Sequence, residues 1–130
     1  MSEAQHPSAL LLSDDLIFTS RVVGTGRMLN LSITAALDSD RLLKTWETAK
    51  VGCIILDLQN PGLDVAALTQ QLREASQDMP FVVAYGSHVD TATLKKARDA
   101  GCDVVVPRSK FVEDLPTALP DWCAGRAMKA

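Results

Sequence analysis

Short runs of apolar residues alternate along this chain with segments in which apolar residues recur at helical spacing. The clearest run is Cys53-Ile54-Ile55-Leu56, which leads directly into Asp57 and a Pro-Gly turn. An apolar run of this length, bounded by turn signals, is typical of a strand that is buried on both faces of a parallel sheet. Five such runs are predicted as strands, at residues 9–12, 31–36, 52–58, 81–85 and 103–106.

Helices are predicted between these strands, and short polar residues mark their starts. They cover residues 16–28, a stretch from Asp38 or Ser39 through 46, a segment after Asp64, residues 91–100 after Asp90, and a last segment from Lys110 or Phe111. The last segment contains two prolines, so we expect that helix to be short or broken into two pieces. Strands that alternate with helices through short connections predict an α/β fold, with a parallel sheet covered by helices on both faces.

The composition is that of one globular domain: 130 residues, 47% of them hydrophobic and 22% charged. We expect a flexible arm at residues 1–8, the domain at 9–124 and a flexible tail at 125–130. The formal net charge of -3 argues against nucleic acid or an anionic membrane as a partner. No apolar run approaches the roughly 20 residues needed to cross a bilayer. The three cysteines are too scattered for a disulfide framework or a zinc site, which favours a cytoplasmic location.

Asp57 is the main candidate for chemistry, because it falls at the carboxyl end of a central strand, where open α/β sheets bind ligands. Asp14 and Asp15 follow the first strand and would lie beside it. Two carboxylates about 4 Å apart repel each other by roughly 4 kcal/mol at an effective dielectric near 20, so a cation between them is expected, and oxygen ligands suit Mg²⁺. A carboxylate held in this way can attack a phosphoryl group. The alternative is that Asp14 and Asp15 cap a helix while Asp57 merely ends a strand.

Four segments carry a resemblance to a known family through their order and spacing: Ser13-Asp14-Asp15, residues 57–64, residues 86–90 and residues 97–103. In their order and spacing, the chain from residue 10 to residue 119 resembles the receiver domain of two-component response regulators. The resemblance implies a flavodoxin-like three-layer sandwich, with a five-stranded parallel sheet in the strand order 2-1-3-4-5. It also implies a signalling domain rather than an enzyme.

The same resemblance implies that Asp57 accepts a phosphoryl group from a sensor histidine kinase or a phosphotransfer protein. Mg²⁺ would lie between Asp57, an acidic residue of the first turn, and the backbone carbonyl of Gln59. The register of that turn is open. If the first strand ends before Ser13, then Ser13 takes the first of two acidic positions and Mg²⁺ binding is weakened. If the strand is one residue longer, Asp14 and Asp15 are the acidic pair.

At three further positions the chain departs from the family pattern. Gly86 falls where the family has a Thr or Ser whose hydroxyl follows the phosphoryl group, and Ser87 lies one place late. Val105 falls at the position of an aromatic switch residue. Arg108 falls at the position of the lysine that pairs with a phosphoryl oxygen, and its guanidinium differs from an ammonium in shape and reach. Lys110 would substitute only if the loop bent back.

Two functional hypotheses follow. The first is a stand-alone receiver, a monomer or weak homodimer, which docks a downstream protein through the face between the strand at 81–85 and the last helix. The alternative is a pseudo-receiver that acts as an interaction module without phosphorylation. A third class, a small flavodoxin-like enzyme or cofactor binder, has little support, because no phosphate loop, nucleophile elbow or run of metal ligands is present.

Overall fold

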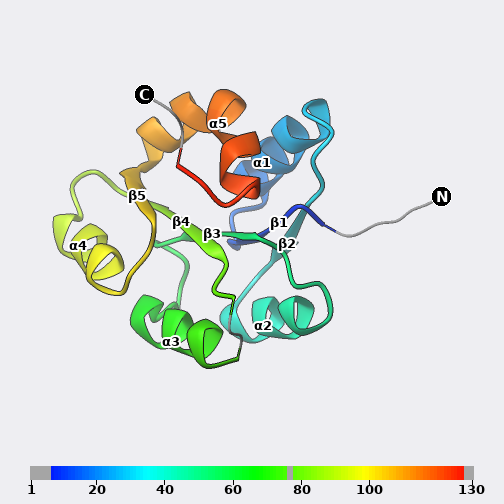
Figure 1. The fold of residues 1–130 in the computed structure, drawn as a ribbon. Coiled ribbons are helices and arrows are strands. Elements are labelled where there is room, and N and C mark those ends of the chain that lie inside the picture. The colour runs from blue at the N-terminus through cyan, green and yellow to red at the C-terminus, as the bar shows by residue number, and fades with distance from the viewer. Residues whose placement is uncertain (1–6, 76–77, 128–130) are drawn as a thin grey trace.

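A computed structural model describes residues 7–75 and 78–127, and it contains one five-stranded sheet between two layers of helices (Figure 1). All four strand pairings are parallel, and the strand order is β2-β1-β3-β4-β5, as predicted. The helices α1 and α5 cover one face, and α2, α3 and α4 cover the other (Figure 1). The elements are β1 (Ala9–Leu12), α1 (Leu16–Met28), β2 (Ile33–Ala36), α2 (Ser39–Thr48), β3 (Cys53–Asp57), α3 (Val65–Ala75), β4 (Phe81–Gly86), α4 (Thr91–Asp99), β5 (Val104–Pro107) and α5 (Arg108–Cys123).

The sheet separates two hydrophobic cores. Leu10 and Leu56 belong to the core beneath α2, α3 and α4, whereas Ile55 and Tyr85 belong to the core beneath α1 and α5. Successive side chains on a strand point to opposite faces, so Asp57 projects to the same side as Ile55. The alternation within β3 therefore directs the Asp57 carboxylate toward α1 and α5.

The last helix differs from its prediction. It runs without a break from Arg108 to Cys123, through Pro116 and Pro120, so the prediction of a short or broken helix is wrong. It also begins directly after Pro107, two residues earlier than expected. Both internal prolines are exposed, and the carbonyls that lose an amide partner can therefore bond to water. The opposite face holds the helix on the sheet through Phe111, Leu115, Ala118, Leu119 and Trp122.

The other predicted elements are present, with small shifts at their ends. The strand β2 begins at Ile33 rather than at residue 31, while β4 extends to Gly86 and β5 to Pro107. The helix α1 has its predicted bounds even though it contains two glycines. One of them, Gly26, lies against β2, because a Cβ there would be 2.7 Å from Cγ1 of Ile33. Close approach of helix and strand explains why glycine is accepted at that position.

The predicted domain limits stay a prediction. Most of the proposed arm and tail, residues 1–6 and 128–130, lies outside the described residues. Ser8, assigned to the arm, continues the sheet: its backbone N donates to the Ser32 carbonyl at 2.6 Å, and its hydroxyl accepts from the Ser32 N–H. Arg126 pairs with Asp121 at 3.0 Å. None of the described helices is long and apolar enough to span a membrane.

Candidate functional site

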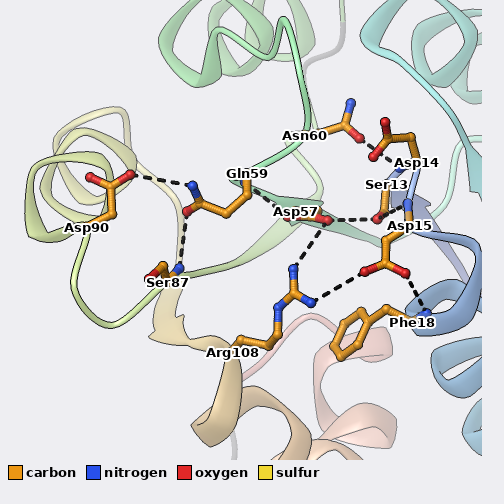
Figure 2. Close-up of polar contacts among 10 residues, drawn as sticks. All are labelled: Ser13, Asp14, Asp15, Phe18, Asp57, Gln59, Asn60, Ser87, Asp90 and Arg108. Carbon is orange, nitrogen blue, oxygen red and sulfur yellow. Dashed lines mark hydrogen bonds and ion pairs between the residues drawn. The ribbon is translucent and has the colours of Figure 1, made fainter.

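The carboxyl ends of β1, β3 and β4 meet at one edge of the sheet, and the polar residues gather there. The strand β1 ends at Leu12, which is in register with Leu56, so Ser13 is the residue beside Asp57. The Ser13 hydroxyl donates to Oδ2 of Asp57 at 2.8 Å (Figure 2). Both side chains are buried, with exposures of 1% for Ser13 and 3% for Asp57. Of the two registers left open by the sequence, the structure has Ser13 in the first position after the strand.

The two aspartates of the first turn serve different ends. Asp15 is the N-cap of α1, because its Oδ1 accepts from the Phe18 N–H at 3.0 Å, and this hydrogen bond is the main reason that its pKa is lowered. Asp14 has an exposed side chain, while its backbone N–H donates to Oδ1 of Asn60 at 2.7 Å. Asn60 in turn donates to the Leu37 carbonyl at 3.1 Å. Asn60 thus fixes the acidic turn, and Asp14 keeps a free carboxylate at the mouth of the site.

Arg108, the first residue of α5, supplies the positive charge. Its Nη2 lies 3.9 Å from Oδ2 of Asp57, and its Nη1 lies 3.5 Å from Oδ2 of Asp15 (Figure 2). The guanidinium also stacks over aromatic rings, 4.7 Å from the centroid of Phe18 and 5.7 Å from that of Tyr85. These four contacts hold one cation across the mouth of the buried carboxylate.

Gln59 forms the third side of the site. Its backbone N–H donates to Oδ1 of Asp57 at 3.0 Å. Its side chain turns away toward the loop between β4 and α4, where Oε1 accepts from the Ser87 N–H at 3.1 Å and Nε2 lies 3.5 Å from Oδ2 of Asp90 (Figure 2). The Asp57 carboxylate is therefore bonded by a hydroxyl and a backbone amide, with a guanidinium nearby.

The structure brings neither Gly86 nor Ser87 into hydrogen-bonding contact with Asp57 in the part of the chain that it describes. A Cβ at Gly86 would point toward Gln59 and Leu58, lying 2.9 Å from Oε1 of Gln59 and 3.3 Å from Cβ of Leu58. The Ser87 hydroxyl accepts instead from the Val89 N–H at 3.4 Å. Lys110 pairs with acidic residues of its own helix rather than with Asp57. Val105 is half-buried and packs against the core beneath α2, α3 and α4.

Sequence reasoning missed Tyr85, which is the residue of β4 in register with Asp57. Its side chain is fully buried on the same side of the sheet, against Phe18 at 5.0 Å and Phe111 at 4.5 Å between ring centroids. Burial is the main cause that raises the pKa of Tyr85, and the charge of Asp57 adds to it. Its hydroxyl has no hydrogen-bond partner of acceptable geometry. The signal lies in where the strands begin: with β3 starting at Cys53 and β4 at Phe81, Asp57 and Tyr85 are each the fifth residue, whereas the predicted start at residue 52 aligns Asp57 with Gly86.

A groove of about 690 Å³ opens beside Arg108, between the start of α5 and the loop that follows β4. Gln59, Ser87 and Arg108 contribute polar groups to it, while Phe18 and Val112 contribute apolar surface. The exposed side chains of Leu16 and Ile17 follow directly after the helix cap at Asp15. The site is thus open to a second molecule.

This edge of the sheet offers oxygen ligands for a divalent metal, but few of them are carboxylates. Among residues 7–75 and 78–127, no group of three or more His, Cys, Asp or Glu side chains is placed to hold a metal. Ser13 lies next to Asp57 and brings a hydroxyl rather than a carboxylate, and Asp15 is engaged by its helix and by Arg108. Asp57, Asp14 and the Gln59 carbonyl remain, a set that suits Mg²⁺, because this ion commonly takes one or two carboxylates and completes its shell with water.

Five parallel strands in this order, with a buried aspartate ending the central strand, define a flavodoxin-like domain of the receiver class. The sequence profile of the response regulator receiver domain matches residues 10–119, and the chain belongs to that family. Receivers are signalling domains of two-component systems. The predictions of family, fold and strand order are thereby confirmed.

Solved structures of other receivers have the same fold. The receiver domain of NtrX from Brucella abortus is 18% identical, with a TM-score of 0.77 over 91% of this chain and 99% of that one. The Saccharomyces cerevisiae receiver of Ssk1, solved with the histidine phosphotransfer protein Ypd1, is 19% identical, with a TM-score of 0.72 over 92% and 90%. The beryllofluoride-activated NtrC4 receiver dimer is 19% identical, with a TM-score of 0.71 over 88% and 97%. No curated protein matches the sequence closely enough to name a relative.

Proposed function

We propose that Asp57 is the phosphoacceptor of a two-component phosphorelay. The observation that carries the proposal is the buried Asp57 carboxylate at the end of β3, bonded by Ser13 and by the Gln59 amide and faced by Arg108. A carboxylate oriented in this way is a preorganised nucleophile. In the transfer, a bond forms between phosphorus and a carboxylate oxygen of Asp57 while the phosphorus–nitrogen bond of a phosphohistidine breaks. The imidazole nitrogen keeps the electron pair and takes a proton from solvent.

Arg108 would stabilise the negative charge of the incoming phosphoryl oxygens, as the family's lysine does. Its guanidinium already lies 3.9 Å from Oδ2 of Asp57 and faces an open groove, so a small movement would bring it to a phosphoryl group. A guanidinium donates through a planar fork and can bind two oxygens at once. Arg108 is therefore the counterpart of the lysine, with a different geometry of contact.

Mg²⁺ is the expected cofactor, held by the carboxylates of Asp57 and Asp14 and by the backbone carbonyl of Gln59. When bound, the ion would neutralise charge on the phosphoryl oxygens. Asp15 is the less suitable of the two turn aspartates, because its oxygens are engaged by the Phe18 N–H and by Arg108. With Ser13 in place of a carboxylate, we expect the affinity for Mg²⁺ to be lower than a pair of acidic residues would give.

The phosphoryl donor is expected to be a sensor histidine kinase or a phosphotransfer protein. Support comes from two exposed apolar residues next to the site, Leu16 with 73% and Ile17 with 87% of its surface exposed. Exposed apolar groups beside a polar site are typical of a docking surface. The Ssk1 receiver, which has this fold, was solved with a phosphotransfer protein. A monomer or weak homodimer with a downstream partner on the face from β4 to α5 remains our expectation.

The test is incubation with Mg²⁺ and acetyl phosphate, followed by intact mass spectrometry. We expect a mass increase of one phosphoryl group, stable to acid and labile to base, which disappears in Asp57→Asn. Asp64→Asn is the matched control, because Asp64 caps α3 on the surface, where asparagine caps equally well, and this variant should be labelled like the wild type. If the wild type takes up no phosphoryl group from acetyl phosphate or from a phosphohistidine donor, Asp57 is not a phosphoacceptor.

The second candidate function is an interaction module that does not depend on phosphorylation. It is favoured by Arg108, which already gives the Asp57 carboxylate a cation, and by Ser13, which gives it a hydrogen-bond donor. This function predicts that a partner binds the wild type and Asp57→Ala with equal affinity in a pull-down. A binding difference of tenfold or more between the two would exclude it.

A further inference from the structure

Gln59 connects the candidate phosphoacceptor to a loop on the other side of the site. Its backbone N–H bonds Oδ1 of Asp57 at 3.0 Å, while its side-chain carbonyl accepts from the Ser87 N–H at 3.1 Å (Figure 2). The two hydrogen bonds are made by a single residue, so only the length of one side chain separates them. Among the described residues, no other residue bonds both the Asp57 carboxylate and the loop at residues 87–90.

The same side chain also reaches the start of α4. Its amide nitrogen lies 3.5 Å from Oδ2 of Asp90, the residue that caps α4 by accepting from the Thr93 N–H at 3.2 Å. The pKa of Asp90 is lowered, chiefly by its hydrogen bonds with Thr93 and in smaller part by Gln59. Between Ser87 and Asp90 the loop exposes Val89, with 75% of its surface accessible. Gln59 thus contacts both ends of a short loop whose exposed tip is formed by His88 and Val89.

Gly86 is the third part of this arrangement. A Cβ at that position would lie 2.9 Å from Oε1 of Gln59, closer than real Cβ atoms come to an oxygen. The glycine therefore gives the Gln59 carbonyl room to reach the Ser87 amide. A side chain at residue 86 would occupy the space that the Gln59 carbonyl now fills.

We propose that Gln59 is the positioning residue that transmits a change at Asp57 to the loop at residues 87–90 and to the N-terminus of α4. A new group on the carboxylate, or its removal, moves the acceptor to which the Gln59 backbone is bonded, and the side chain carries that movement to Ser87 and Asp90. The proposal deepens the proposed function, and rests on it for the natural trigger. The link itself is a property of the unmodified chain and can be tested without phosphorylation.

The test measures hydrogen exchange at the Ser87 amide in a double-mutant cycle of Gln59→Ala and Asp57→Ala. Loss of the bond to Oε1 in Gln59→Ala should speed exchange at Ser87 about fivefold to tenfold, the equivalent of one partly exposed hydrogen bond. Gln70→Ala is the matched control, because Gln70 is an exposed glutamine that bonds only Glu74 on α3, and its loss should leave exchange at Ser87 unchanged.

The coupling between Asp57 and Ser87 is measured by comparing the effect of Asp57→Ala in the wild type and in Gln59→Ala. Asp57→Ala should speed exchange at Ser87 at least threefold in the wild type and have no effect in Gln59→Ala. Equal effects in the two backgrounds would overturn the proposal, because Gln59 would then merely support the loop. Asp57→Asn is the second variant should Asp57→Ala not fold; it keeps Oδ1 as an acceptor, so it should leave exchange at Ser87 close to the wild-type rate, and a threefold rise would overturn the proposal.

Gly86→Ala tests the steric part. It should speed exchange at Ser87 as much as Gln59→Ala does, and the double variant should be no worse than either; additive effects would overturn this part. A final arm adds Mg²⁺ and beryllofluoride, a phosphoryl mimic. If it shifts the Ser87 amide signal in the wild type but not in Gln59→Ala, the trigger is confirmed as well. If it binds nowhere while the cycle above shows coupling, the proposed function fails and the link stands.

Discussion

Tyr85 offers the sharpest test of the structure, because its hydroxyl is buried without a hydrogen-bond partner of acceptable geometry. A buried donor that is left unpaired costs about 1–3 kcal/mol. The Tyr85→Phe change removes that hydroxyl and keeps the ring, which lies 5.0 Å from Phe18 and 4.5 Å from Phe111. We therefore expect the free energy of unfolding to rise by about 1 kcal/mol, the lower end of that range, since part of the cost is relieved by local relaxation.

The assay is urea unfolding followed by tryptophan fluorescence. Trp122 stacks on Phe111 at 5.6 Å between centroids, so its emission reports the packing around Tyr85. A gain of about 1 kcal/mol corresponds to a rise in Tm of roughly 2–6 °C for a domain of this size. Tyr85→Leu is the control that removes the ring as well, and it should lose about 2–4 kcal/mol. A loss of 1 kcal/mol or more in Tyr85→Phe would refute the reasoning, because the hydroxyl would then be bonded in the folded protein.

The pH dependence of the free energy of unfolding, compared between the wild type and Tyr85→Phe, gives an independent check. The pKa of Tyr85 is raised in the folded protein, so above a pH of about 10 the unfolded chain loses the phenolic proton while the folded chain keeps it. The wild type therefore loses stability as the pH rises through that value, and phenylalanine does not. The advantage of Tyr85→Phe should be constant between about pH 6 and 9 and should grow above pH 10. A constant difference at every pH would contradict the buried position of the hydroxyl.

Three further predictions follow from the helix ends and the site. Pro116→Ala should raise the free energy of unfolding by about 1–3 kcal/mol in urea, because this exposed proline removes a helix hydrogen bond; an unchanged value would contradict this. Because the pKa of Asp15 is lowered, its stabilising effect is present at neutral pH and is lost as the pH falls through its folded pKa, so the Tm gap between wild type and Asp15→Ala should narrow below about pH 4. Arg108→Gln should tighten Mg²⁺ binding about tenfold in calorimetry, because it removes a cation 3.9 Å from Asp57; equal affinity would argue against a metal at this carboxylate.

The sheet was predictable because its strands are short apolar runs with sharp ends. Cys53–Asp57 and Ala9–Leu12 are buried along their whole length, so hydrophobicity alone marks them. Continuity of α5 was not predictable in the same way. A proline lowers helix stability locally, but whether the helix breaks depends on which side the proline faces. The structure shows that Pro116 is on the exposed side of α5, opposite Phe111 and Leu115, and the sequence alone does not reveal this.

In the candidate site, too, local sequence predicts some features, while others depend on how the elements pack. The position of Asp57 follows from the end of an apolar run, which local sequence specifies. The register of the turn that holds Asp15 and the start of α5 at Arg108 came only from the structure. The direction in which a strand residue points depends on register between strands that are far apart in the sequence. A shift of one residue moves a side chain to the other face, so the sequence alone did not reveal that Tyr85 is the residue of β4 in register with Asp57.

The contacts of Arg108 can distinguish the two functional proposals, because Arg108 is a cation beside the Asp57 carboxylate of the unmodified site. Two unit charges about 4 Å apart attract by roughly 1–4 kcal/mol between the dielectric of water and that near a protein surface. A phosphoryl group on Asp57 carries more negative charge than the carboxylate and extends further into the groove beside Arg108. The guanidinium would then leave Asp15, which it now contacts at 3.5 Å, and follow the phosphoryl oxygens. We therefore expect phosphorylation of Asp57 to break the Arg108–Asp15 pair, whereas a module that acts without phosphorylation would keep it.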